Sequence, residues 1–416
     1  MDWIVFLRVL SIVLVTLTSV CFFYQIVYLL LPYVNRKRPQ AEKKTARYAV
    51  LIPARNEEAV LPHLLQSLRE QTYSSELIDI YVIADNCTDR TAQIAREGGA
   101  EVVERFDREQ IGKGYALQYL LSHIRQTKGL DAYDAFLVFD ADNLLDKGYI
   151  QNIHGMYEEG YEVFCGYRNS KNFSGGWVAA GYSVWYLHDS THLNRSRMVL
   201  GTSCAVNGTG FGFTRETLRR IGDDWRFFTL TEDLEFNAWC ITNGIKIGYC
   251  HDAILYDEQP ITFRVSVRQR IRWVQGGFQI AFKYAGALFR GLFKGNWISY
   301  SCYETMTVSL WGYGLGALSG ITTVLLTGLE GGWPALGILA LTALPTAYVS
   351  LLLIGLLTVL TDRKRIRAKT RQKVLAVFAF PLFMLTFVPL AVIAPFCKFE
   401  WVPVEHTVAV GTDSLE

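Results

Sequence analysis

The chain has 416 residues, of which 50% are hydrophobic and 19% are charged, and its formal net charge is +2. This charge says little about nucleic acid by itself, but no basic stripe runs along the sequence, so we do not expect nucleic acid as a partner. The eight cysteines are scattered without a C-x-x-C pair, which is typical of reduced thiols and argues against a disulfide framework or a zinc site. Long charge-free stretches at both ends enclose a region of ordinary soluble composition.

The N-terminal stretch predicts a transmembrane helix. Residues 9–35 contain no charged side chain, and 25 helical residues reach about 37 Å, more than the ~30 Å hydrocarbon core of a bilayer. A signal peptide would have a shorter apolar region and a small-residue cleavage site, so we assign residues 1–35 to a membrane anchor. Basic residues follow at 36–38, and the positive-inside rule then places residues 36–259 in the cytoplasm.

Residues 36–259 alternate strand and helix patterns, as α/β domains do. The apolar runs 48–53, 78–84 and 136–139 predict buried strands, and a shorter strand is expected at 102–104. Right-handed crossovers between such units give a Rossmann-like, mostly parallel sheet covered by helices. The loops after these strands then converge at one edge of the sheet, where open α/β folds bind ligands.

Two carboxylates and one lysine mark this edge. The run 136–139 stops on Asp140 and Asp142, whose oxygens suit a hard divalent cation and, through it, a diphosphate; a solvated turn is the alternative. Lys113 lies between two glycines that let the backbone approach a ligand, and its ammonium suits a phosphate, although an ordinary loop lysine would look the same. Because the full P-loop spacing is missing, ATP hydrolysis is not expected.

Two later segments also carry candidate site residues. Residues 207–213 are predicted to form a flexible loop or a strand, and their three glycines allow close approach of another chain or of a sugar. Thr231 is placed to cap a helix that begins with Glu232 and Asp233. Capping and the helix dipole alone would also explain this triplet.

The C-terminal part is predicted to lie on and in the membrane. Residues 260–300 mix arginines with apolar side chains, as interfacial helices do. Residues 301–397 form a transmembrane region, in which the charge-free stretches 305–329 and 331–361 predict two spanning helices that turn near Glu330.

The end of this region leaves an alternative open. Seven basic residues between 363 and 373 mark a cytoplasmic loop, where lipid headgroups are the expected partners. The stretch 374–397 is uncharged but interrupted by prolines, so it either crosses the bilayer or re-enters it. The side on which the tail 398–416 lies depends on that choice.

Four motifs in this order resemble the signature of family 2 glycosyltransferases: Asp85, the D-x-D of 140–142, the T-E-D of 231–233 and the Q-x-x-R-W of 269–273. The membrane-embedded synthases of poly-N-acetylglucosamine, hyaluronan and cellulose are similar. The resemblance implies a GT-A fold flanked by transmembrane and interfacial helices. It also implies inverting transfer from a UDP-sugar, with UDP-N-acetylglucosamine or UDP-glucose favoured, to a growing polysaccharide, coupled to its translocation.

Two alternatives remain beside the polysaccharide synthase. Enzymes similar to ceramide glucosyltransferase share the signature, so transfer of a single sugar to a lipid is the first. A catalytically inactive membrane binding protein is the second, and the presence of all four motifs argues against it.

The resemblance also assigns roles to residues. Asp233 is expected to be the general base for the acceptor hydroxyl, with Glu232 and Arg272 completing the catalytic group. Asp142 is expected to hold Mg²⁺ or Mn²⁺. Contacts to the donor and acceptor fall to Pro53, Arg55, Glu57, Asp85, Lys113, Asp140, Asn207, Gly208, Gln269 and Trp273.

Partners and location follow from the same resemblance. They are a UDP-sugar donor, a polysaccharide or lipid acceptor, membrane lipids and, as a further option, an accessory export or regulatory subunit. The expected location is the plasma membrane, with several spans and a cytoplasmic catalytic domain. The sequence 207–210 differs from the F-x-C-G-like motif of cellulose synthases, which counts against cellulose as the product. Trp401, Pro403 and His406 resemble gating segments near the donor site, provided that the tail is cytoplasmic.

Overall fold

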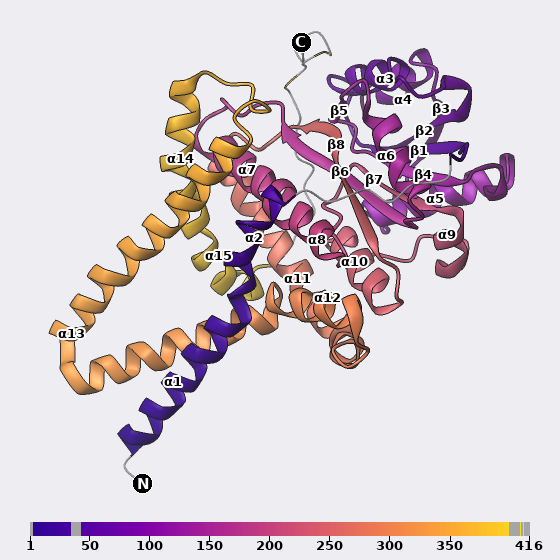
Figure 1. Cartoon of the computed structure of the whole chain (residues 1–416). Helices are drawn as coiled ribbons and strands as arrows, with labels where there is room; N and C mark the ends of the chain where they lie inside the picture. The colour runs from indigo at the N-terminus through magenta and orange to yellow at the C-terminus, as the bar shows by residue number, and fades with distance from the viewer. Residues whose placement is uncertain (1–2, 35–42, 399–407, 409–410, 412–416) are drawn as a thin grey trace.

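A computed structural model describes residues 3–34, 43–398, 408 and 411 of the chain. Figure 1 shows an α/β unit from which long helices extend. The predicted gating residues Trp401, Pro403 and His406 lie outside the described residues.

One eight-stranded sheet forms the centre of the α/β unit, in the order β3-β2-β1-β4-β7-β6-β8-β5. Four neighbouring pairs are parallel, whereas β7 runs antiparallel to β4 and β6, and β5 runs antiparallel to β8. The sheet is therefore mixed, and its fully parallel half contains the strands predicted from the sequence. The strands are β1 (Tyr48–Ala54), β2 (Ile78–Asp85), β3 (Glu101–Arg105), β4 (Ala135–Val138), β5 (Leu144–Leu145), β6 (Val163–Ser170), β7 (Phe211–Thr214) and β8 (Ile247–Asp257).

Helices cover this sheet because their apolar side chains recur at helical spacing. On α3, Leu61, Leu64, Leu65 and Leu68 are all buried. Helix α5 packs on β1, β2 and β3, and α6 packs on β6 and β8. The helices of the unit are α3 (Leu61–Arg69), α4 (Thr91–Glu97), α5 (Lys113–Thr127), α6 (Tyr149–Glu158), α7 (Trp177–His188), the π-helix η4 (Asp189–Asn194), α8 (Arg195–Leu200), α9 (Arg215–Ile221) and α10 (Glu232–Thr242), with short 3₁₀ turns η2 (Ser75–Leu77) and η3 (Leu130–Ala132).

Among the residues that the structure describes, three helical segments are long and apolar enough to cross a membrane: Trp3–Tyr33, Leu310–Thr361 and Thr370–Phe396. The first contains α1 (Trp3–Phe22), α2 (Tyr24–Tyr28) and η1 (Leu31–Tyr33). The second is α13 (Leu310–Thr361), which bends at Gly332, where φ is 62° and ψ is −157°. The predicted turn near residue 330 is therefore present.

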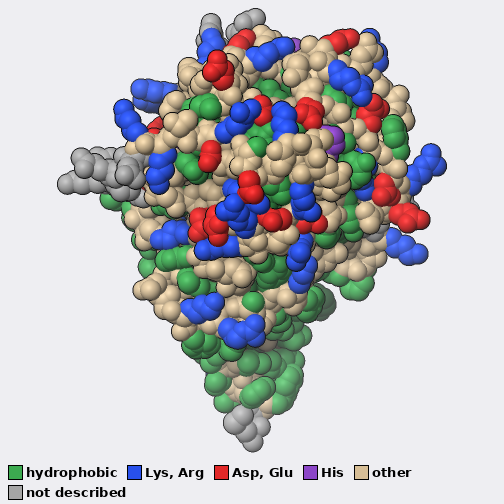
Figure 2. Space-filling model, turned by 90° about the vertical axis from the view of Figure 1, so that its right-hand side faces the viewer, with side chains coloured by type: hydrophobic (Ala, Val, Ile, Leu, Met, Phe, Trp, Pro, Cys, Tyr) green, Lys and Arg blue, Asp and Glu red, His purple; other side chains and the backbone are tan. Residues whose placement is uncertain are grey.

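The turn of α13 meets the start of α1. Arg8 Nη2 lies 2.5 Å from Glu330 Oε1, and α1 packs along α13. Both lie at the end of the molecule farthest from the sheet (Figure 1). Figure 2 shows that this tapered end is mostly hydrophobic, whereas charged side chains gather over the α/β unit.

The third segment is broken and returns to the α/β unit. It consists of α14 (Thr370–Leu385), α15 (Phe387–Ile393) and η5 (Ala394–Phe396). Asn169 Nδ2 donates to Arg365 O at 2.9 Å just before α14. Gln275 Nε2 donates to the carbonyls of Ala394 and Cys397, each at 2.8 Å, at its end. Both ends of this segment therefore contact the α/β unit or the helix that follows it.

The region predicted to be interfacial forms two helices. They are α11 (Phe263–Gly291) and α12 (Asn296–Thr307). Helix α11 packs against α10, α12 and α15, so it lies between the end of the α/β unit and the broken C-terminal segment.

Candidate active site

Three segments meet beyond the carboxyl end of β4. Lys113, the first residue of α5, donates from Nζ to Asp140 Oδ1 at 2.5 Å and to Gly208 O at 2.6 Å. The backbone N–H of Asp140 donates to Thr209 Oγ1 at 2.9 Å and to Asn143 Oδ1 at 3.1 Å. Lys113 thereby joins the D-x-D motif to the glycine-containing loop.

Glu232 and Asp233 open α10 and interact with the same lysine. Burial raises the pKa of both carboxyls, and the Asp233 charge raises that of Glu232 further, whereas Lys113 and Arg272 lower both. Burial alone would lower the pKa of the Lys113 ammonium, but the charges of Asp140 and Glu232 raise it. Carboxyls with raised pKa values beside a cation are typical of sites that transfer protons.

The start of α10 is positioned by close contacts. A Cβ added at Gly208 would lie 3.8 Å from Asp233 Oδ2, so the glycine loop borders this carboxylate. Thr231 occupies the N-cap position but its side chain makes no capping hydrogen bond, so the predicted cap is wrong. The side chain instead packs on Gly276 of α11, where an added Cβ would come within 2.3 Å of Thr231 Oγ1. This contact replaces the cap as the support of the T-E-D segment.

Asp142 lies beside these groups and is buried. Its Oδ2 accepts the Glu258 N–H at 3.2 Å, and its Oδ1 accepts Asn143 Nδ2 at 3.4 Å. Within the described part of the chain, no group of three or more His, Cys, Asp or Glu side chains is arranged to hold a metal ion. The carboxylates still fit Mg²⁺ or Mn²⁺, because such ions are commonly bound by one or two carboxylates together with phosphate oxygens of the substrate.

A second group of predicted residues lies at the ends of β1 and β2. Asp85 is buried and pairs with Arg105 Nη1 at 2.7 Å. Burial raises the pKa of Asp85, and Arg105 and Arg55 lower it. Pro53 is half-buried in β1, and the buried Glu57 donates its backbone N–H to a threonine hydroxyl at 2.8 Å. Since β1 separates β2 from β4, the tip of β2 with Asp85 lies about 10 Å from the tip of β4, a spacing of two strands.

The Q-x-x-R-W residues lie on the first turns of α11. Gln269 Oε1 is buried without a hydrogen-bond partner in the described chain. The Arg272 charge acts on Glu232 and Asp233, so this guanidinium faces the same site. The Trp273 ring is half-buried and packs edge-on against Tyr182, with the ring centroids 5.8 Å apart.

The profile of the family described as "Glycosyltransferase like family 2" matches residues 46–276, more than half of the chain. The chain belongs to this family. It is 26% identical over 270 residues to the probable glycosyltransferase YdaM of Bacillus subtilis (strain 168), covering 60% of this chain and 59% of YdaM. It is also 26% identical over 238 residues to the beta-monoglucosyldiacylglycerol synthase of Synechocystis sp., covering 55% of this chain and 47% of the relative. The chain thus spans about half the length of these relatives.

A solved structure shares the fold of this chain. It is the mannosyltransferase PcManGT from Pyrobaculum calidifontis in complex with GDP-Man and Mn²⁺, with a TM-score of 0.57 at 16% identity, covering 93% of this chain and 99% of that chain. The α/β unit therefore has the GT-A fold expected from the motifs, with the mixed sheet described above.

The candidate site also contains residues that were not predicted from the sequence. Arg168 of β6 donates from Nε to Asp257 Oδ2 at 2.9 Å and from Nη1 to Asn207 O at 2.6 Å. Its guanidinium lies 3.8 Å from the centroid of the Tyr186 ring. Asn143 links Asp257 to Asp142 through its side-chain amide. Only Asn143 had a local signal, since it directly follows the D-x-D motif.

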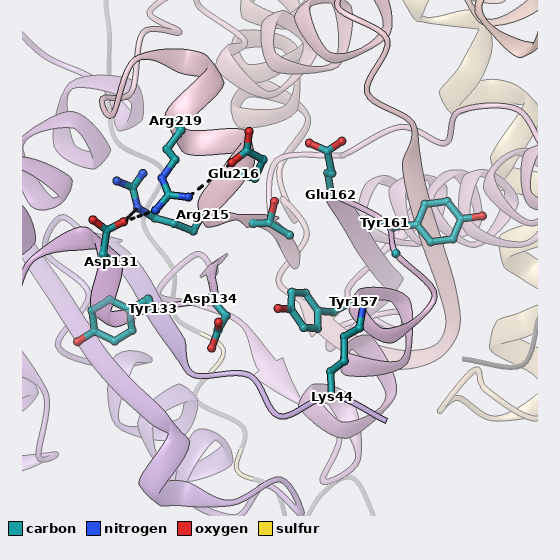
Figure 3. Close-up of a pocket in the computed structure, with 12 residues that line it drawn as sticks. Lys44, Asp131, Tyr133, Asp134, Tyr157, Tyr161, Glu162, Arg215, Glu216 and Arg219 are labelled. Carbon is teal, nitrogen blue, oxygen red and sulfur yellow. Dashed lines mark hydrogen bonds and ion pairs between the residues drawn. The ribbon is translucent and has the colours of Figure 1, made fainter. Parts of the chain in front are cut away.

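One surface cavity lies away from this site. It has a volume of about 400 Å³ and is lined by residues at the opposite ends of β4, β6 and β7, such as Asp134, Glu162 and Thr214. Its arginines are already paired: Figure 3 shows Arg215 and Arg219 directed at Asp131. The cavity therefore offers no group toward the predicted reaction.

Proposed function

We propose that the protein is an inverting glycosyltransferase that binds a nucleoside diphosphate sugar across the carboxyl ends of β2, β1 and β4. The placement of Lys113 carries this proposal, because its ammonium lies between Asp140, the Gly208 carbonyl and the charges of Glu232 and Asp233. A cation so placed suits a diphosphate between a metal-binding carboxylate and a candidate base. UDP-N-acetylglucosamine and UDP-glucose are the favoured donors.

Donor binding follows the layout of the two residue groups. Pro53, Arg55, Glu57 and Asp85 would contact the nucleoside, and the diphosphate would lie near Lys113 and Asp140. A nucleoside diphosphate bridges the spacing of about 10 Å between the tips of β2 and β4. A Mg²⁺ or Mn²⁺ ion held at Asp142 would neutralise charge on the diphosphate.

In the transfer step, Asp233 accepts the proton of the acceptor hydroxyl while the acceptor oxygen bonds to the anomeric carbon. The bond from that carbon to the diphosphate oxygen breaks, and UDP leaves with the electron pair. Attack opposite the leaving group inverts the configuration. Proton transfer by a placed base is worth roughly 10²–10⁴-fold in rate, and Lys113 and Arg272 add positive charge near the departing oxygens.

A lipid hydroxyl is one acceptor class, and the position of the C-terminal segment supports it. The apolar α14 packs on α7, and α15 packs on α11, which carries Gln269, Arg272 and Trp273. A lipid acceptor could therefore reach the site from the membrane surface. Synthases of monoglucosyldiacylglycerol are among the relatives, which adds support.

A growing polysaccharide is the second acceptor class. The half-buried ring of Trp273 offers an apolar face of the kind on which sugar rings stack. An N-acetylglucosaminyltransferase of Rhizobium leguminosarum is 23% identical over 239 residues. Asn207, Gly208 and Gln269 would lie beside the terminal sugar, and the helices α1 and α13 would accompany its translocation. A multi-pass plasma-membrane location with a cytoplasmic site, and the option of an accessory subunit, belong to the same proposal.

The decisive experiment measures UDP or GDP release by the purified full chain across a panel of nucleotide sugars, with Mg²⁺ or Mn²⁺, followed by sizing of the product. Release of the nucleotide from one donor sugar that increases when a membrane extract is added as the source of acceptor supports glycosyl transfer. A product carrying a single sugar on a lipid identifies the first acceptor class, and a polymer identifies the second. No release with any donor, metal or acceptor would overturn the proposed function.

A further inference from the structure

A buried chain of polar contacts begins at the active site. Asp257 Oδ2 accepts Arg168 Nε at 2.9 Å, and Arg168 Nη1 donates to the Asn207 carbonyl at 2.6 Å. The Asn207 side-chain amide then donates to Asp189 Oδ2. Asp189 is the first residue of the π-helix η4, and it is 8% exposed. The loop that carries Gly208 is therefore held from two sides by charged groups.

This path of polar contacts continues from Asp189 toward the N-terminal helical segment. Asn194 Nδ2 donates to Asp189 Oδ2 at 3.3 Å, and Arg197 Nη1 donates to Asn194 Oδ1 at 2.9 Å. Arg197 Nε donates to Glu304 Oε1 at 2.8 Å. The Tyr28 hydroxyl of α2 donates to Glu304 Oε2 at 3.3 Å. Charges alternate along the whole path, from Asp257 to Glu304.

These charges are buried at a cost that a purely apolar interior would avoid. Arg197 is 6% exposed and Glu304 is 3% exposed. Buried ion pairs are often replaceable by apolar residues without loss of stability, so stability alone is a weak reason for them. The π-helical turn supports the same conclusion, because such turns are rare and are frequently found at functional sites. Both features converge on Asp189, which no motif includes.

We propose that Asp189 is a positioning residue for glycosyl transfer: through Asn207 it fixes the Gly208 carbonyl that holds Lys113, and through Arg197 and Glu304 it links this loop to Tyr28 of the membrane anchor. The inference rests on the proposed function of Lys113 and Asp233. It predicts that the placement of α2 and the order of the loop 207–210 depend on one another.

The first test compares Asp189→Asn with Thr191→Val in the full chain in detergent or nanodiscs. Thr191 belongs to the same π-helix and is buried. Its hydroxyl donates to Asp362 Oδ2 at 2.7 Å, and Asp362 is not part of the path of polar contacts described above. Asp189→Asn should lower kcat at least tenfold, with a donor KM within threefold of wild type, because the nucleoside group at β1 and β2 is untouched. Thr191→Val should leave both constants near wild type at a comparable loss of Tm.

Hydrogen exchange supplies a readout that does not need turnover. Asp189→Asn should speed amide exchange in residues 207–210 at least tenfold while β1 and β2 exchange as in wild type. Thr191→Val should not change exchange in the loop. If the wild type turns over no donor, the proposed function fails, and the exchange experiment still decides whether Asp189 orders the loop.

A second pair of variants tests the link to the anchor and serves if Asp189→Asn does not fold. Tyr28→Phe removes the hydroxyl that donates to Glu304 of α12. Tyr24→Phe, also in α2, removes a hydroxyl that lies 3.3 Å from Thr307 Oγ1, likewise in α12. Tyr28→Phe should lower kcat about threefold and speed loop exchange, and Tyr24→Phe should do neither. Equal effects of the two tyrosine variants, or wild-type kcat and loop exchange in Asp189→Asn, would overturn the inference.

Discussion

Replacing Lys113 by methionine should shift the acidic limb of the pH–activity profile. Lys113 lowers the pKa values of Glu232 and Asp233, which burial raises. Removing it therefore raises both, and since a base acts only when deprotonated, activity at low pH is lost first. An opposite charge nearby typically shifts a carboxyl pKa by about 1–3 units, and Arg272 remains, so we expect about 1 unit, or about 1.4 kcal/mol.

The assay is nucleotide release at saturating donor between pH 5.5 and 9.5. The limb at low pH should move up by about 1 unit in Lys113→Met and stay in place in Lys113→Arg, which keeps the charge. The donor KM should also rise in Lys113→Met, because the ammonium faces the diphosphate. An acidic limb that stays in place or moves to lower pH would refute the electrostatic role given to this lysine.

Four other changes test the site. Asp233→Asn should abolish transfer while calorimetry still shows UDP binding, and near wild-type turnover would exclude it as the base. Asp142→Asn should raise the Mn²⁺ concentration for half-maximal activity at least tenfold; an unchanged metal titration would remove Asp142 as a ligand. Gly276→Ala should lower kcat about tenfold, because its Cβ would meet a side chain at 2.3 Å; Gly277→Ala, with nothing within 4 Å, is the matched control. Arg270→Leu removes the hydrogen bond from Arg270 Nη1 to Thr386 Oγ1 and should lower the Tm by several degrees; an unchanged Tm would show that the C-terminal segment does not depend on this contact.

The sequence predicted the parts of the fold that have local signals. The parallel strands β1, β2 and β4, the bend of α13 and the family all followed from apolar runs, a glycine turn and four short motifs. Residues 207–213 were predicted as a loop or a strand, but the antiparallel pairing of β7 with β4 and β6 was not predicted, because it joins segments far apart in the chain. The Thr231 cap was wrong because its side chain packs on Gly276, a tertiary contact that overrides a capping preference.

In the candidate site, too, residues with a local sequence signal were predicted, whereas residues brought in by tertiary contacts were not. Asp85, Asp140, Glu232 and Asp233 stand at a strand end or at the start of a helix, where the local sequence pattern identifies them. Their supports come from elsewhere: Arg105 holds Asp85, and Arg168 with Asp257 holds the Asn207 loop. Such partners are brought together by sheet pairing and carry no spacing that a reader of the sequence could find.

Helix α11 contacts both the candidate site and the broken C-terminal segment. On one side its Gly276 contacts the residue that precedes Glu232 and Asp233. On the other, the buried Arg270 donates from Nη1 to Thr386 Oγ1 at 2.6 Å, where α14 breaks, and lies 4.7 Å from the centroids of two phenylalanine rings on either side of that break. Within the described residues, Arg270 Nη2 is buried without a hydrogen-bond partner. A rotation of α11 would therefore disturb the candidate base and the C-terminal segment together.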